Sequence, residues 1–127
     1  MKYLIDTKIL IWILIDTNKI PSNILDLIKK KENEIYLSLV SIWEIAIKIS
    51  IGKLILPFEL NNIIQEINEL NINIIEIKPE HLIKTAELPF VHKDPFDRLI
   101  ISKSIIENLP IITSDNNFKN YNVNLIW

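Results

Sequence analysis

The chain has 127 residues, of which 49% are hydrophobic and 24% are charged, and its formal net charge is −2. This length and composition predict a single folded domain over residues 1–127 with its own hydrophobic core. The absence of cysteine excludes disulfides, thiolate zinc sites and cysteine nucleophiles, and the single glycine, Gly52, excludes a glycine-rich phosphate loop. The negative net charge argues against binding nucleic acid through a broad basic surface.

The predicted elements alternate between short apolar strands and longer amphipathic helices. In chain order they are a strand at 3–5, helices at 8–14 and 23–31, a strand at 35–39, helices at 41–51 and 60–70, a strand at 74–77, helices at 79–87 and 95–107, and strands at 111–113 and 124–126. Such alternation implies crossover connections. We therefore expect an α/β fold with a mostly parallel sheet that helices cover on both faces.

Residues with capping preferences set several of these helix boundaries. Ser41 is the expected N-cap of the third helix, and Gly52 is the expected residue just beyond its end. Asp94 is the expected N-cap of the helix at 95–107, and Pro95 fits its first position, where no intrahelical N–H is needed.

The first fifteen residues superficially resemble a signal peptide, because a lysine precedes an apolar run. Asp6 and Lys8 interrupt that run, no small-residue cleavage site follows it, and it is too short to span a bilayer. We therefore expect a cytoplasmic protein that does not insert into a membrane.

Four acidic residues are expected to meet at one edge of the sheet, because ligands of an open parallel sheet bind beyond the carboxyl ends of its strands. Asp6 follows the first strand, and Asp115 follows the strand at 111–113. Glu44 lies about one turn into the helix after the second strand, and Asp97 lies in the first turn of its helix.

Each of these acids also has a purely structural interpretation. Asp6 and Asp115 fit N-caps, Asp97 fits a first-turn acid that the helix dipole favours, and Glu44 fits an exposed helix residue. The neighbours of Glu44 are apolar, however, so its helix face is expected to be buried.

The Leu-Ile-Asp-Thr motif occurs twice, and its second copy places Asp16 at the far end of the first helix, where we interpret it as a turn residue.

A shared cation would explain why carboxylates gather despite their mutual repulsion, which otherwise raises their pKa values. An all-oxygen donor set, without cysteine or suitably spaced histidine, favours Mg²⁺ or Mn²⁺ over Zn²⁺. Mg²⁺ commonly binds through a few carboxylates together with substrate phosphates. The predicted chemistry is therefore cation-assisted, in-line hydrolysis of a phosphodiester bond.

Other polar and aromatic residues are weaker candidates. Thr113 and Ser114 fit hydrogen-bonding partners of the carboxylates, although turn residues after a strand are the simpler interpretation. Some basic residues are candidates for contact with substrate phosphates, chiefly Lys48 and Arg98, and also Lys53 and Lys93. The alternative is that these residues only form solvated helix faces. We assign no role to either histidine, His81 or His92. We expect the tryptophans to lie in the core rather than to stack on bases: Trp12, Trp43 and Trp127.

Four segments are distinctive when they are taken together. They are Tyr-Leu-Ile-Asp-Thr, then Ser-Ile-Trp-Glu-Ile-Ala-Ile-Lys followed by Gly-Lys-Leu, then His-Lys-Asp-Pro-Phe-Asp-Arg-Leu-Ile-Ile, and finally Ile-Thr-Ser-Asp-Asn-Asn-Phe. In order and spacing they resemble the PIN-domain family over essentially the whole chain. Within that family, the chain is similar to VapC-like toxins of bacterial type II toxin–antitoxin pairs.

The resemblance implies a three-layer α/β/α domain with Mg²⁺- or Mn²⁺-dependent ribonuclease activity on RNA. It places the family's acidic cluster at Asp6, Glu44, Asp97 and Asp115. It also implies a homodimeric toxin that a cognate antitoxin inhibits by inserting a segment near the acidic site.

Two residues, Asp94 and Lys8, need separate comparison with the family. Asp94 matches an acid common in VapC-like proteins, and we interpret it as a helix cap first and a supporting group of the site second. Lys8 stands where similar proteins often have histidine. A lysine near the carboxylates would compete with the cation.

Two other functions remain open on the sequence alone. One is a catalytically weak domain that binds RNA or an antitoxin without cleaving. The other is a phosphatase or phospho-acceptor with an aspartate after the first strand. Haloacid-dehalogenase phosphatases, however, have a second acid where this chain has Lys8, and receiver domains have paired acids that are missing here.

Overall fold

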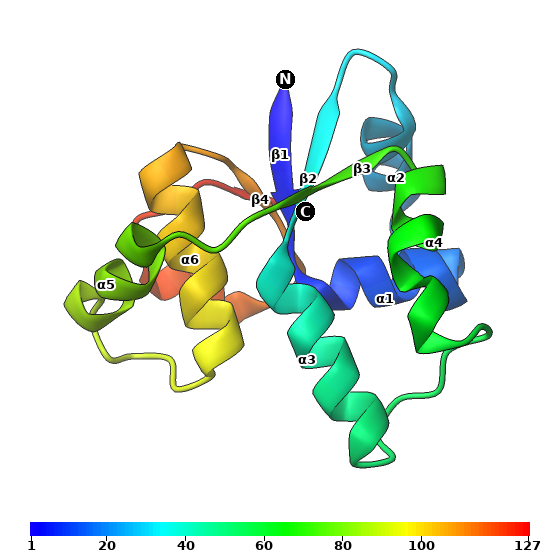
Figure 1. Cartoon of the computed structure of the whole chain (residues 1–127). Coiled ribbons are helices and arrows are strands. Elements are labelled where there is room, and N and C mark those ends of the chain that lie inside the picture. Colours follow the sequence, from blue (N-terminus) through cyan, green and yellow to red (C-terminus); the bar gives the residue numbers. More distant parts are fainter.

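Five parallel strands form the centre of the molecule in the computed structural model, which describes residues 1–127 (Figure 1). The order across the sheet is β3-β2-β1-β4-β5, and every neighbouring pair is parallel. The strands are β1 (Lys2–Ile5), β2 (Glu34–Ser38), β3 (Ile72–Ile75), β4 (Ile111–Ile112) and β5 (Leu125–Ile126). The expected parallel sheet is therefore confirmed.

Helices cover both faces of this sheet and give three layers. In Figure 1, α1, α2 and α4 lie on one side of the strands and α5 and α6 on the other, while α3 extends away from the carboxyl end of β2. The helices are α1 (Thr7–Ile15), α2 (Ser22–Lys29), α3 (Leu39–Ser50), α4 (Ile63–Glu69), α5 (Pro79–Glu87) and α6 (Pro95–Glu107). Three short 3₁₀ helices complete the chain: η1 (Thr17–Lys19), η2 (Leu60–Asn62) and η3 (Asn116–Asn120).

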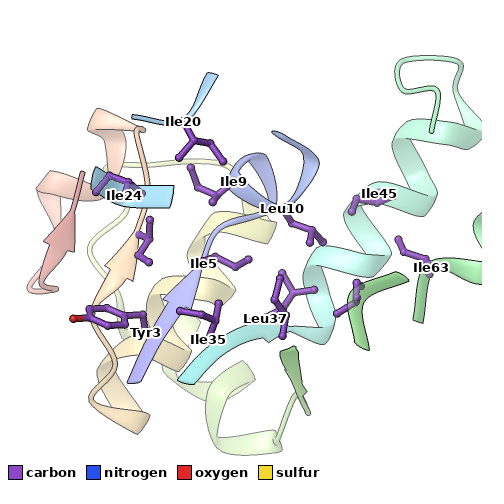
Figure 2. Close-up of a cluster of buried hydrophobic side chains, with 13 residues drawn as sticks. Tyr3, Ile5, Ile9, Leu10, Ile20, Ile24, Ile35, Leu37, Ile45 and Ile63 are labelled. Carbon is purple, nitrogen blue, oxygen red and sulfur yellow. The ribbon is translucent and has the colours of Figure 1, made fainter. Parts of the chain in front are cut away.

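Two hydrophobic clusters fill the spaces on either side of the sheet. Successive strand residues point to opposite faces, so Leu4 joins one cluster and Ile5 joins the other. Ile111 and Ile112 divide in the same way. Figure 2 shows the cluster around Ile5, in which strand side chains meet those of α1, α3 and α4. Burial on both faces explains why the strands are continuous apolar runs.

The predicted N-cap of α3 was wrong. Ser38, rather than Ser41, is the N-cap of α3, and its hydroxyl oxygen accepts a hydrogen bond from the Val40 N–H at 3.3 Å. β2 passes directly into α3, because Ser38 is both the last strand residue and the cap. Ser41 therefore lies inside the helix, where its hydroxyl accepts a hydrogen bond of 2.9 Å from the Thr7 hydroxyl.

Other boundaries agree with the capping analysis. α5 and α6 span the predicted residues, and the Asp94 carboxylate accepts a hydrogen bond of 2.9 Å from the Asp97 N–H at the start of α6. Gly52 follows the end of α3 with a φ of 72°, the left-handed region that glycine adopts without strain. β3 starts two residues earlier than expected.

All of the helices are too short or too polar to traverse a lipid bilayer.

Candidate active site

The strand order creates a binding position at the carboxyl edge of the sheet. β1 pairs with β2 on one side and with β4 on the other, so the chain winds in opposite directions from β1. In open α/β sheets, ligands bind at this point of reversal. Asp6 directly follows β1, and the segment from Thr113 to Asp115 directly follows β4, which brings both segments to this position.

Asp6 is buried and uses its two carboxylate oxygens differently. Oδ1 accepts a hydrogen bond of 2.9 Å from the Ile9 N–H and so caps α1, while Oδ2 accepts one from the Thr113 hydroxyl. Burial raises the pKa of Asp6 from 3.8 to about 6, because desolvation outweighs these hydrogen bonds, and the charge of Asp115 adds to the shift. Asp6 is therefore a helix cap that also carries an unfavourable buried charge at neutral pH.

Thr113 connects the carboxyl ends of β1 and β4. Its hydroxyl donates to Asp6 and also accepts a hydrogen bond of 3.0 Å from the Asp115 N–H. The Asp115 carboxylate caps η3 by accepting a hydrogen bond of 2.9 Å from the Asn117 N–H. The hydroxyl of Ser114 makes no hydrogen bond to these carboxylates.

Asp97 lies at the start of α6, beside a histidine. Its Oδ2 is 2.8 Å from Nε2 of His92. Burial raises the pKa of Asp97 from 3.8 to about 7, and the charges of Asp94 and Glu44 add to the shift, while His92 opposes it. His92, Asp97 and Asp115 each offer a ligand atom within 4.8 Å of the others.

His92 is a site residue that the sequence analysis missed. It lies outside a helix, two residues before the cap at Asp94, so no helical spacing relates it to an acid. Its approach to Asp97 depends on how the segment between α5 and α6 folds back, and that is a tertiary feature. The other histidine, His81, is fully buried between the Lys78 N–H and the Glu107 carboxylate, and it links α5 to α6.

Glu44 is the buried acid of α3. Its Oε2 lies 2.9 Å from the Lys48 ammonium nitrogen, whereas its buried Oε1 has no hydrogen-bond partner. An unsatisfied buried acceptor costs about 1–3 kcal/mol. The hydrogen bond between Thr7 and Ser41 fastens the start of α1 to α3 and so fixes Glu44 relative to Asp6.

Arg98 does not present free donors to the acidic cluster. Its buried guanidinium donates through Nη1 to the carbonyls of Pro89 and His92 and through Nη2 to those of Thr85 and Leu88. Nη1 also donates to the Tyr121 hydroxyl at 3.1 Å. Arg98 therefore holds the segment that carries His92, and this geometry does not favour the expected contact with phosphate.

The structure bears on three further expectations. The prediction of a core position was wrong for Trp43 and Trp127, which are 59% and 46% exposed, while Trp12 is partly buried. The Lys8 ammonium lies 5.7 Å from the centroid of the Trp12 ring and makes no ion pair with Asp6, but its charge lowers the pKa of Asp6, so competition with a cation stays a prediction. Asp16 caps η1 at the far end of α1, as a turn residue should.

The four carboxylates fit a hard divalent cation. Their oxygens are the donors that Mg²⁺ and Mn²⁺ prefer, and the orphaned Oε1 of Glu44 lacks a cationic or N–H partner. Burial is the main cause of the raised pKa values of Asp6 and Asp97, neighbouring carboxylates add to both shifts, and a bound cation would offset them. His92, Asp97 and Asp115 lie close enough together to share one ion. The charge of Asp115 raises the pKa of Asp6 and the charge of Glu44 raises that of Asp97, so these two further acids lie near the same group.

Comparisons with known proteins agree with this architecture. The family model of the PIN domain matches residues 3–124. The chain is similar in structure to VapBC2 from Rickettsia felis bound to a DNA fragment from its promoter, with a TM-score of 0.72 and 26% identity over 99% of this chain and 98% of that chain. DNA-bound VapBC from Salmonella typhimurium has a TM-score of 0.71 and 16% identity over 99% and 97% of the two chains.

A toxin–antitoxin complex from Klebsiella pneumoniae shares the fold as well, with a TM-score of 0.66 and 17% identity over 98% of this chain and 96% of that chain. No curated protein sequence matches closely enough to count as a relative. The family match covers nearly the whole domain and omits, among the strands, only the first residue of β1 and all of β5. The chain therefore belongs to the PIN domain family.

Proposed function

We propose that this protein is a Mg²⁺- or Mn²⁺-dependent endoribonuclease that acts as the toxin of a toxin–antitoxin pair. The observations that support the proposal are the close approach of Asp97, Asp115 and His92, the burial of Asp6 at the end of β1, and the unpartnered oxygen of buried Glu44. Such a cluster is costly unless a cation binds it, and phosphodiester hydrolysis is the chemistry that carboxylate-bound Mg²⁺ serves in proteins.

In this proposal, Asp6, Glu44, Asp97 and Asp115 hold the cation. A bound divalent cation supplies positive charge that stabilises the negative charge accumulating on the phosphoryl oxygens during hydrolysis. Thr113 orients Asp6 through its hydrogen bond. A bound cation would favour the ionised forms of Asp6 and Asp97, because its charge would offset the desolvation that raises the pKa of each.

Supporting roles fall to residues around the cluster. We propose that Lys48, which lies beside Glu44, contacts a substrate phosphate once the cation has replaced it as the partner of that carboxylate. Arg98 and Asp94 act indirectly, because Arg98 fixes the segment carrying His92 and Asp94 caps the helix that carries Asp97.

The likeness to VapBC and toxin–antitoxin complexes supports the biological part of the proposal. We propose a cognate antitoxin as partner, a homodimer as the working form of this chain and the cytoplasm as its location. Co-expression with a small neighbouring reading frame, followed by affinity purification, tests for the antitoxin. Recovery of this chain alone would contradict that part.

Ribonuclease activity is tested with purified protein and single-stranded RNA in Mg²⁺ or Mn²⁺. We expect cleavage that excess chelator abolishes and that Asp97→Asn abolishes as well. The matched control is Asp16→Asn, since Asp16 stands in the second copy of the same Leu-Ile-Asp-Thr motif but caps η1 outside the site. Undiminished cleavage in chelator, or by Asp97→Asn, would reject the proposal.

A domain that binds RNA or antitoxin without cleaving is the alternative. The observation that favours it is the Lys48–Glu44 pair at 2.9 Å, because an internal ammonium competes with a cation for that carboxylate. Metal titration separates the two functions. A functional site should raise the melting temperature in Mn²⁺ by mass action, whereas a domain without the site should show no such rise.

A further inference from the structure

A cavity of about 460 Å³ lies beside the amino ends of β1 and β4, on the face of the sheet that α6 covers. Its lining includes Lys2, the first residue of β1, and Leu109, which precedes β4. The acidic cluster follows the carboxyl ends of the same two strands, and none of its residues lines this cavity. Small-molecule sites in proteins have volumes of about 300–1,000 Å³, so the cavity is large enough to be one.

Lys103 of α6 lines the cavity although it is only 3% exposed. An ammonium has three N–H donors, but the Nζ of Lys103 donates to a single acceptor, the backbone carbonyl of Glu76, and forms no ion pair. Burial lowers the pKa of Lys103, while the charge of the Glu107 carboxylate opposes this shift. Lys103 is therefore a buried amine with spare donors and no counter-ion.

The carboxylates that line the cavity do not satisfy these spare donors. The Lys78 N–H donates to Nδ1 of His81 at 2.9 Å, so Nε2 of His81 carries the ring proton and donates to the Glu107 carboxylate at 3.0 Å. Glu107 is thus held by His81. Glu76 reaches Lys103 through its backbone and not through its carboxylate.

The rest of the lining combines positive charge with apolar surface. Lys2 and Lys78 join Lys103, so the lining carries three ammoniums against the two carboxylates of Glu76 and Glu107. This balance favours an anion and disfavours a metal ion. The remaining walls are apolar or aromatic: Tyr36, Ile74, Ile75 and Leu109. Such walls favour a ligand that also has an apolar part.

We propose that this cavity binds a small organic anion, a carboxylate or a phosphate monoester with an apolar body, whose charged oxygens accept hydrogen bonds from Lys103. The apolar body lies against Ile74 and Ile75 of β3. Because the cavity is separate from the acidic cluster, this inference does not depend on the proposed nuclease activity.

Nuclear magnetic resonance titration of the full chain in excess chelator tests the inference with four probes. Phenyl phosphate and benzoate should each shift the amide resonances of Glu76, Lys103 and Leu109 in a saturable way, and their relative affinities identify the preferred charged group. Benzyl alcohol has the ring without the charge, and inorganic phosphate has the charge without the ring. Each should bind at least roughly 10-fold more weakly than the better organic anion.

Substitutions of single lysines assign the binding to the cavity. Lys103→Met preserves an unbranched buried side chain without the ammonium, and it should weaken binding by roughly 10- to 150-fold, the range for a hydrogen bond to a charged group. Lys19→Met is the matched control, because Lys19 is exposed on η1 and does not line the cavity. If Lys103→Met does not fold, Lys78→Gln at an exposed position should still weaken binding by roughly 2- to 5-fold.

Several results would overturn the inference. Equal affinities of folded Lys103→Met and Lys19→Met would remove Lys103 from the site. Binding of benzyl alcohol as tight as that of the anions would show that charge plays no part, and equal binding of inorganic and phenyl phosphate would leave the apolar walls without a role. Shifts confined to residues 92–97 and 113–115 would place the probes at the candidate active site instead.

Discussion

Replacing Asp6 with asparagine tests whether the acidic cluster is a stability defect that a cation corrects. Asp6 carries a buried charge at neutral pH, and asparagine removes that charge while its side-chain carbonyl still accepts the capping hydrogen bond from Ile9. We therefore expect Asp6→Asn to be more stable than wild type when divalent cations are chelated.

The size of this effect follows from the pKa of Asp6, which burial raises from 3.8 to about 6. A raised pKa means that the folded state binds the proton more tightly than the unfolded state does. The wild-type free energy of unfolding thus loses this contribution as pH rises from about 4 to about 6. At 1.36 kcal/mol per pKa unit the loss is about 3 kcal/mol, or roughly 10 °C in melting temperature.

Urea denaturation in excess chelator measures the difference. At about pH 7.5, Asp6→Asn should exceed wild type by about 3 kcal/mol, and at about pH 4 the two should converge, because Asp6 is then protonated in the folded state. Asp16→Asn, at the exposed end of α1, should show no such pH-dependent gain. In saturating Mn²⁺ the order should reverse, since only wild type keeps the full set of ligands.

Equal stabilities of wild type and Asp6→Asn in chelator at neutral pH would refute the reasoning. A difference of the same size at both pH values would refute it as well, because the gain would then come from packing or hydrogen bonding rather than from the charge.

Three further substitutions test the fold. Arg98→Met should lower the free energy of unfolding by about 2–4 kcal/mol in urea denaturation, because carbonyls of segment 85–92 lose their hydrogen-bond donors. A loss under about 1 kcal/mol would contradict the role of Arg98 in holding that segment. Gly52→Ala should cost about 1 kcal/mol in thermal unfolding from its φ of 72° alone, since nothing lies within 4 Å of an added Cβ, and a gain would be incompatible with that strain. Ile67 is 0% exposed, so Ile67→Ala should lower the free energy of unfolding by about 2–5 kcal/mol. Ile55 is 86% exposed, so Ile55→Ala should change it by no more than about 0.5 kcal/mol. Similar losses for both variants would argue against the described core.

Much of the architecture could be predicted from local patterns. Apolar runs separated by amphipathic segments predicted every strand and the helices between them, because parallel strands are buried on both faces. The starts of α5 and α6 were predictable since Pro79 and Pro95 fit first helical positions and Asp94 fits a cap. The start of α3 was not, because Ser38 and Ser41 are equally good caps by residue type and only the extent of β2 decides between them.

Some residues of the candidate site could be predicted from the sequence, and others depend on tertiary packing. Asp6 and Asp115 could be placed because strand ends are readable, and parallel strands bring their carboxyl ends to one edge. The contacts of His92 and Arg98 depend on how the segment between α5 and α6 packs, and the exposure of Trp43 depends on how α3 packs against α6. No period or cap in the sequence specifies that packing, so these residues were misjudged until the contacts were known.

The pairing of β4 with β1 has a consequence for when the protein can act. This ladder joins only Leu4 with Ile111 and Ile5 with Ile112, and the hydrogen bond from Thr113 to Asp6 spans 107 residues of sequence. Closing so distant a contact is entropically costly and slow. On the proposed function, a half-folded molecule would lack the assembled site, and cleavage would be confined to chains that have completed their most remote pairing.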